Sequence, residues 1–320
     1  MKENNYSSIP FVPAALFCCL LWGAPPALIK IGYQEMSISG TPSILLFAGC
    51  RFVISGLMVL MFYLFSEHPD LPDCFRRKGL FKAIFCLALF QTFGQYFFYY
   101  IGLANTTGVI ASILSGASAF FALILSALIY RLEDMTWLKI ISCLLGFAGI
   151  LVMNLKGLTF SFTFAGEGMI LLSQICSAQS AVLIKIFSRK NNPVLLSGCQ
   201  FLLGGMLLTC CGLVSGGHFM LTWTGLLILL ILGFVSAGAY TLWGILLSQY
   251  PVSRVGIFTC TIPLFGVLFS VLFIQEYEAL SAATLIALIL IITGICLLNL
   301  PASHAESRKK KSEDIASQTK

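Results

Sequence analysis

The stretch Gly49–Gly56, GCRFVISG, has a close counterpart in Gly198–Gly205, GCQFLLGG, and both lie inside long apolar runs. Five further matches follow in the same order along the two halves of the chain: LIKI at 28–31 and 183–186, Gly94-x-Tyr96 and Gly238-x-Tyr240, Phe120 and Phe265, Glu133-x-x-Thr136 and Glu278-x-x-Ser281, and Gly149-Ile150 to Asn154-Leu155 with Gly294-Ile295 to Asn299-Leu300. A single match would mean little, because apolar helices share residue types. Six in one order indicate an internal repeat.

Ten apolar runs surround these matches, and each is long enough, or nearly so, to cross a bilayer, which takes about 20 residues. They are Phe11–Ile31, Pro42–Phe65, Phe81–Gly102, Gly108–Tyr130, Trp137–Leu155, Gly168–Phe187, Pro193–Val214, Trp223–Leu247, Val255–Phe273 and Leu280–Leu298. Because open sheets would leave backbone groups unpaired in hydrocarbon, the runs must be helices. The first run is too long for a cleaved signal peptide, so we expect it to be the first transmembrane helix. The predicted fold is an all-α integral membrane protein.

Composition excludes several other classes of protein. The chain of 320 residues is 58% hydrophobic and only 10% charged, whereas a soluble domain carries about 25% charged residues. The net charge of +6 does not indicate nucleic-acid binding, because the basic residues cluster beside helix ends. The 12 cysteines lie almost entirely in apolar runs and form no Cys-x-x-Cys pair. We therefore expect no metal and no cofactor.

The basic residues also predict the orientation and the domain limits. With the N-terminus in the cytoplasm, 15 of the 19 Lys and Arg residues fall in inner segments and only Lys156 lies outside. We expect a cytoplasmic N-terminus (1–10), a first five-helix repeat (11–155), an external linker (156–167), a second five-helix repeat (168–300) and a basic cytoplasmic tail (301–320). Since five crossings are an odd number, the second repeat enters the membrane inverted, as in many transporters.

Several motifs resemble those of the EamA-like members of the drug/metabolite transporter superfamily. They are Trp22-Gly23 followed by Lys30, Arg51-Phe52, Glu133 ahead of a helix with Gly146 and Gly149, and Pro263 in the ninth run. The resemblance covers nearly the whole chain. It implies ten helices around a cavity lined by helices 1, 3, 4, 6, 8 and 9, and export or exchange of metabolites such as amino acids. One departure is Ser118, where the repeat partner is Pro263 and the family often has proline in both halves.

Three basic residues fall within the predicted helices. Arg51 lies near mid-bilayer, where an arginine costs roughly 2.5–3.5 kcal/mol and must face the interior with partners. It could anchor an anionic substrate group, or it could bond to carbonyls of a neighbouring broken helix. We favour the second interpretation, because helix 2 lies outside the implied cavity. Lys30 and Lys185 hold equivalent positions near opposite helix ends; they either extend to the interface or guard the two mouths.

Other candidate site residues are breaks in helices and polar or aromatic side chains. Pro25 in the first run and Pro263 in the ninth remove backbone donors, and a broken helix at the midplane exposes polar backbone to substrate. The remaining candidates are Trp22, Gln91, Gln95, Tyr96, Tyr99, Gln174, Ser177, Tyr240 and Trp243. Such groups either bond between helices or line a cavity, and their concentration in the helices implied to form the cavity favours a site. Ser112 and Ser115 are predicted to form a packing face.

The interiors of the apolar runs contain no Asp, Glu or His. We therefore predict an anionic, zwitterionic or neutral substrate and no proton coupling through a membrane carboxylate. A membrane enzyme would need clustered catalytic groups, whereas His68, His218 and His304 lie in separate connections or the tail. The predicted function is a secondary transporter of a small metabolite, an exporter working by alternating access. Its expected partners are the substrate and the lipid bilayer. A channel or scramblase is the alternative.

Overall fold

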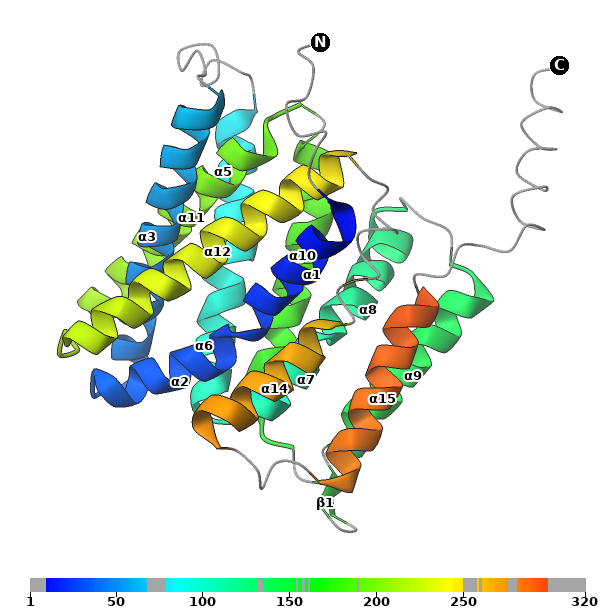
Figure 1. Ribbon diagram of the computed structural model, residues 1–320. Coiled ribbons are helices and arrows are strands. Elements are labelled where there is room, and N and C mark those ends of the chain that lie inside the picture. The colour runs from blue at the N-terminus through cyan, green and yellow to red at the C-terminus, as the bar shows by residue number, and fades with distance from the viewer. Residues whose placement is uncertain are drawn as a thin grey trace, which may run out of the picture.

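The computed structural model describes residues 10–67, 79–131, 135–153, 155–156, 159–160, 162–188, 190–249, 258, 261–275 and 281–298. Residues 1–9 of the predicted N-terminal segment, the basic tail, and the loop residues Glu133 and Glu278 lie outside them. Successive membrane-length helical segments run in alternating directions (Figure 1). Helix α1 begins and α15 ends at one end of the molecule, and β1 lies at the opposite end.

The described residues of the first half form ten helical elements. They are α1 (Phe11–Gly23), α2 (Pro25–Glu35), α3 (Gly40–Glu67), α5 (Leu80–Leu87), the π-helical turn η1 (Ala88–Gly94), α6 (Gln95–Ala104), α7 (Gly108–Ser115), α8 (Ala117–Ile124), the π-helical turn η2 (Leu125–Ile129) and α9 (Trp137–Met153). A short antiparallel pair follows, in which β1 (Leu155–Lys156) pairs with β2 (Thr159–Phe160). The second half contains η3 (Phe164–Gly168), α10 (Met169–Phe187), α11 (Pro193–Val214), α12 (Trp223–Gln249), α14 (Ile262–Ile274) and α15 (Ala282–Leu298).

Among the described residues, seven helical segments are long and apolar enough to cross a membrane, and three shorter apolar helices accompany them. The seven are Phe11–Glu35, Gly40–Ser66, Leu80–Ala104, Gly108–Ile129, Phe164–Phe187, Pro193–Val214 and Trp223–Trp243; the shorter ones are Trp137–Gly149, Leu264–Ile274 and Ala282–Gly294. Each overlaps one of the ten predicted runs. The chain is thus a multi-pass α-helical membrane protein.

Helix breaks occur in several of the segments. The first segment breaks at Ala24, and Pro25 begins α2, where its missing N–H needs no helical partner. In the ninth run the described helix begins at Ile262, so Pro263 lies in its first turn and not mid-helix. The π-helical turn η1 and the break at Gly116 between α7 and α8 were not predicted. The sixth segment begins at Phe164, four residues before the predicted start at Gly168.

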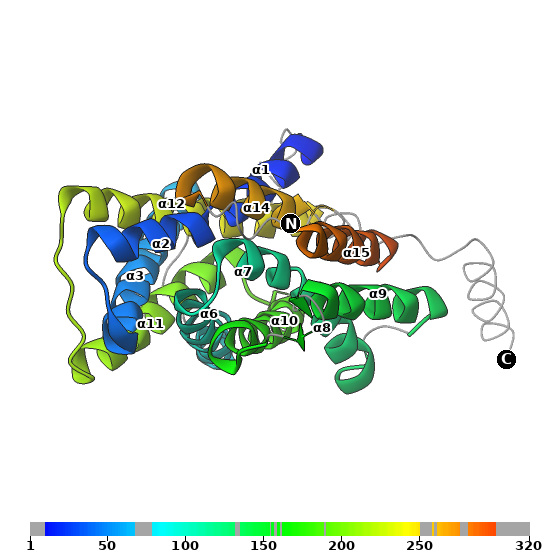
Figure 2. The same cartoon turned by 90° about the horizontal axis from the view of Figure 1, so that it is seen from below.

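Two helix pairs form the ends of an elongated arrangement, with α3 against α11 at one end and α9 against α15 at the other (Figure 2). Glycines allow both close approaches. A Cβ built on Gly49 would lie 2.4 Å from the backbone nitrogen of Thr209. A Cβ on Gly149 would lie 2.9 Å from the carbonyl oxygen of Ala287. Small residues at such positions let helix backbones meet inside a membrane.

The elements between the two pairs belong to the helices that the resemblance assigns to a cavity. Helix α10 contacts α6 and α8, α1 contacts α12 and α14, and α14 contacts α7. Figure 2 places α6, α7, α10 and α14 in this central region. Each of these contacts joins an element of the first half to one of the second, so the centre of the molecule is an interface between the halves.

Candidate substrate site between the two halves

Arg51 lies in the middle of α3 with only 2% of its surface exposed. Its Nε donates to the carbonyl oxygen of Leu232 at 3.3 Å, one terminal nitrogen donates to the Tyr100 hydroxyl at 2.7 Å, and the other donates to the Ser236 hydroxyl at 2.8 Å. The guanidinium carbon also lies 4.9 Å from the centre of the Phe52 ring, within cation–π range. These bonds tie α3 to α6 and α12. One of the three acceptors is a backbone carbonyl, as in the interpretation that has Arg51 bonded to carbonyls of a broken neighbouring helix, but α12 is continuous from Trp223 to Gln249.

The three hydrogen-bond partners of Arg51 carry no formal charge. Among the acidic side chains that the structure describes, Glu35 is exposed at the end of α2. Glu167 is 6% exposed near the linker, where its carboxylate accepts from the Thr163 backbone N–H and the Thr106 hydroxyl, both at 2.8 Å. Neither carboxylate is a partner of Arg51. Because a guanidinium stays protonated in proteins, the described part of the core carries an unbalanced positive charge.

Four aromatic residues beside Arg51 form a matched cluster, which we call the axial aromatic cluster: Phe52, Tyr96, Phe201 and Tyr240. The rings of Phe52 and Phe201 stack with centroids 5.5 Å apart. Phe52 contacts Tyr96 at 4.1 Å, and Phe201 contacts Tyr240 at 5.0 Å. The hydroxyls of Tyr96 and Tyr240 lie 3.4 Å apart. Phe52 and Phe201 are repeat partners, as are Tyr96 and Tyr240, so equivalent residues meet one another at this point.

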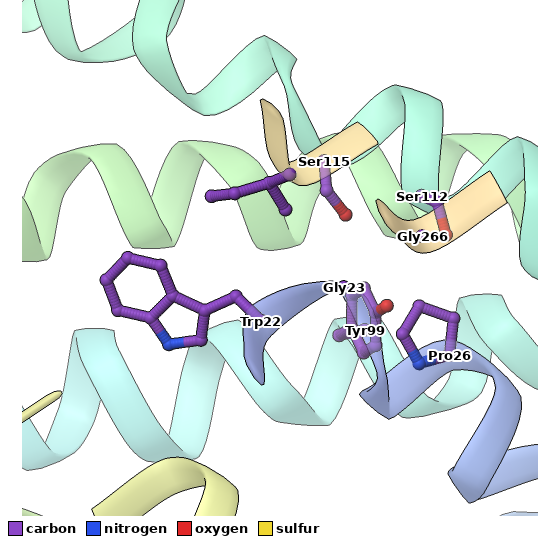
Figure 3. A pocket seen from close by; sticks show the side chains of 8 residues that line it. Trp22, Gly23, Pro26, Tyr99, Ser112, Ser115 and Gly266 are labelled. Atoms are coloured by element: carbon purple, nitrogen blue, oxygen red, sulfur yellow. The ribbon is translucent and has the colours of Figure 1, made fainter. Parts of the chain in front are cut away.

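Trp22 connects this cluster to a small cavity. Its ring lies 5.4 Å from the Tyr240 ring and 4.9 Å from the Trp243 ring, and its buried indole nitrogen has no hydrogen-bond partner in the described structure. The cavity has a volume of about 20 Å³, roughly enough for one water molecule. Figure 3 shows its surroundings, which are Trp22, Gly23, Pro26, Tyr99, Ser112, Ser115, Ile262 and Gly266.

Helices α1, α7 and α14 approach closely at this cavity. A Cβ on Gly23 would lie 2.5 Å from the Cβ of Phe265, and one on Gly266 would lie 2.5 Å from the Ser112 hydroxyl oxygen. The hydroxyls of Ser112 and Ser115 donate to carbonyls one turn back in their own helix, at 2.6 and 2.7 Å. Ser112 packs against Gly266 of α14, as expected for a packing face. Ser112 and Ser115 both line the cavity as well.

The predicted amide candidates are not among the residues that line this cavity. Gln91 and Gln95 are 2% and 9% exposed, and their side-chain oxygens have no partner in the described structure. Gln174 is buried and donates to the Ser173 hydroxyl at 2.7 Å, and Ser177 is half-buried in the same helix. Gln200, the repeat partner of Arg51, is fully buried and accepts a hydrogen bond from Thr92.

The remaining predicted candidates fall into separate places. Pro25 is buried at the start of α2, next to the cavity residue Pro26. Lys30 is half-buried in α2, and Lys185 is half-buried in the last turn of α10. Several contributors were not among the predicted site residues, including Tyr100 and Ser236 at Arg51, Phe52 and Phe201 in the axial aromatic cluster, and Gly266 at the cavity. The match of Phe201 to Phe52 in the repeat was the one signal that could have identified Phe201.

These features define a class: a multi-pass helical protein whose two halves enclose a buried, polar and aromatic centre, as membrane carriers do. The EamA-like transporter family matches residues 10–155 and again 164–300. The chain belongs to this family of transporters.

Curated relatives agree with that assignment. The chain is 28% identical over 289 residues to the uncharacterized transporter YvbV of Bacillus subtilis, covering 88% of this chain and 89% of that protein. It is 22% identical over 298 residues to a chloroplastic WAT1-related protein of Arabidopsis thaliana, covering 88% of this chain and 68% of that protein. A solved crystal structure with 20% sequence identity has a similar fold, with a TM-score of 0.65 over 89% of this chain and 94% of the other.

Proposed function

We propose that this protein is a secondary transporter, working as an exporter, of an amino acid or a related zwitterionic, neutral or anionic metabolite. In this proposal ten helices cross the cell membrane as two inverted five-helix repeats, 11–155 and 168–300, joined by an external linker at 156–167, with both termini in the cytoplasm. The substrate passes at the centre, along the aromatic residues Trp22, Tyr96, Tyr99, Tyr240 and Trp243, with the Arg51 guanidinium next to Tyr96.

The observation that carries the proposal is that equivalent residues of the two halves contact each other. Phe52 stacks on its own repeat partner Phe201, and Tyr96 meets its own repeat partner Tyr240. When two copies are related by a twofold axis, equivalent residues meet each other only next to that axis. The axial aromatic cluster therefore supports a pseudo-twofold axis through the centre of the molecule.

Contacts farther from the centre repeat in the same way. Gly49 approaches Thr209, and Gly198 approaches Leu60. Gly49 and Gly198 are separated by 149 positions in the chain, and so are Leu60 and Thr209. Arg51 bonds to Ser236 in α12 while Gln200 bonds to Thr92 in η1. Ser236 and Thr92 are separated by 144 positions, as are Gly238 and Gly94. Each contact from the first half to the second therefore has a counterpart in which the equivalent residues of the two halves are interchanged.

Alternating access follows from this arrangement. If the halves are related by an axis in the membrane plane, exchanging their conformations converts an inward-open carrier into an outward-open one. The cavity of about 20 Å³ is too small for a metabolite, so a transport cycle must separate the helices around it. The close approaches of Gly23 and Gly266 are the contacts that such a separation would open first.

Flux through proteoliposomes tests the function. Metabolite profiling of cells with and without the protein would supply candidate substrates, and the purified protein would then be assayed for uptake with each candidate preloaded on the opposite side. A carrier gives saturable flux that the preloaded substrate accelerates. Linear flux with no such acceleration would indicate a channel or scramblase and overturn the proposal.

Two variants test the proposed site within that assay. Arg51→Gln and Tyr96→Ala should change the KM or the maximal rate of flux. Met206→Leu, at an exposed position of α11, is the matched control and should leave both unchanged. If the two site variants fold and keep wild-type KM and rate, these site assignments fail.

Cysteine labelling tests the inverted arrangement. In a background without native cysteines, single cysteines at Gly157 and at Ser317 would be treated in intact cells with a membrane-impermeant maleimide. The proposal predicts labelling at 157 only. Equal labelling of both positions in intact cells would exclude an odd number of crossings between them, that is, in the second half.

A further inference from the structure

We infer that the substrate of this site is an anion, a carboxylate or a phosphate, and that Arg51 supplies the attraction for it. The inference rests on the proposed transport function and deepens it by naming the substrate class. Its starting point is the guanidinium of Arg51, which is 98% shielded from solvent and bonded to neutral groups only.

The charge lies close to the centre of the molecule. Tyr100, which accepts the 2.7 Å bond from Arg51, is the neighbour of Tyr99, which lines the cavity; their ring centroids are 6.3 Å apart. On the other side, the Arg51 carbon lies 5.8 Å from the Tyr96 ring, and Tyr96 belongs to the axial aromatic cluster. By the shorter route, the side chains of Tyr100 and Tyr99 therefore connect Arg51 to the cavity.

A fixed charge in such surroundings acts over that distance. Coulomb interactions in a medium of effective dielectric constant near 20 remain several times stronger than in water. No carboxylate among the described side chains contacts Arg51 to cancel its field. A substrate that brings a negative charge to the cavity is attracted, and one that brings a positive charge is repelled.

The free hydrogen-bonding capacity also favours an acceptor ligand. A guanidinium has five N–H donors, and Arg51 uses three of them. The indole N–H of Trp22 is a donor with no acceptor capacity, and it has no partner in the described structure. The hydroxyls of Tyr96 and Tyr240 contact each other, and this contact uses only one of their two O–H donors. A carboxylate or phosphate accepts from donors of this kind.

Fluorescence quenching of Trp22 tests the field without knowing the substrate. A variant with Trp137, Trp223 and Trp243 replaced by Phe leaves Trp22, which lines the cavity, as the one emitter. The protein, held in lipid nanodiscs, would be quenched by iodide, by neutral acrylamide and by caesium. Each quenching constant is divided by that of free N-acetyltryptophanamide, because iodide quenches indole more efficiently than caesium by its own chemistry. After this division iodide should exceed caesium, and Arg51→Gln should lower the iodide-to-acrylamide ratio about five-fold.

Two further variants separate charge from structure. Arg51→Lys keeps the charge but loses the planar fork, and Ser236→Ala removes one bond but keeps the charge; both should retain the iodide preference. The inference is overturned if caesium quenches as well as iodide in the wild type, or if Arg51→Gln leaves the ratio unchanged.

The flux assay separates the inference from the proposed function. Equal transport of a carboxylate and its amide would contradict the anion assignment and leave the transport function standing. Absence of any flux would instead contradict the proposed transport function.

Discussion

Positions 51 and 200 occupy matched places on the two sides of the axial aromatic cluster, yet they carry different chemistry. Arg51 donates to α12 and α6 through three bonds. Gln200 accepts one bond from Thr92, and its amide nitrogen has no partner in the described structure. If the two halves are related as proposed, the difference is confined to the charge and its bonds. The comparison teaches that two halves with matched contacts can still place a charge on one side of the centre only.

The largest effect should come from making the two sides alike. Gln200→Arg places a second guanidinium where the Gln200 amide nitrogen already lacks a partner. A poorly paired arginine at this depth costs about 3 kcal/mol, so the folded yield should collapse or the thermal midpoint in detergent should fall steeply. Size-exclusion profiles and thermal melts measure this. A stability within about 0.5 kcal/mol of wild type would mean that the Gln200 side accommodates a cation as the Arg51 side does.

The helix contact that supports both positions offers a second comparison. A Cβ on Gly49 would meet the backbone of Thr209 at 2.4 Å, whereas one on Gly198 would meet the Leu60 side chain at 2.8 Å. Because a side chain can move and a backbone cannot, Gly49→Ala should cost about 2 kcal/mol and Gly198→Ala about 1. Gly238→Ala, whose nearest neighbour atom would be 3.8 Å away, is the tolerated control. Equal losses at 49 and 198 would contradict this asymmetry.

The helices and their order were predictable from the sequence because membrane spans follow from apolar length. Two helix N-caps were predictable too, because Ser and Thr favour the position just before a helix. The Thr136 and Ser281 hydroxyls accept from the backbone of residues 139 and 284, at 3.4 and 3.1 Å. The bond from Arg51 to Ser236 was not predictable, since it joins residues 185 positions apart and depends on how α3 crosses α12. The π-helical turn η1 could not be predicted either, because its residue composition does not differ from that of the helix around it.

Double-mutant cycles would compare the bonds on the two sides. Arg51→Gln with Ser236→Ala should give a coupling of about 1 kcal/mol, because a charged donor lies 2.8 Å from its acceptor. Gln200→Ala with Thr92→Ala, on the neutral side, should give about 0.6 kcal/mol, the average for hydrogen bonds between transmembrane helices. Both are read from unfolding in mixed micelles. A larger coupling on the neutral side would show that charge is not what strengthens the first bond.

The smallest effect is expected where the two sides touch. The 3.4 Å separation of the Tyr96 and Tyr240 hydroxyls is long for an O–H···O bond, so Tyr96→Phe should change stability by less than about 0.5 kcal/mol. Tyr240→Phe should do the same, because either change removes one contact that the two residues share. For that reason the double variant should lose no more than one of the single variants. Additive losses would mean that each hydroxyl has its own separate partner, and the two tyrosines would then not meet across an axis.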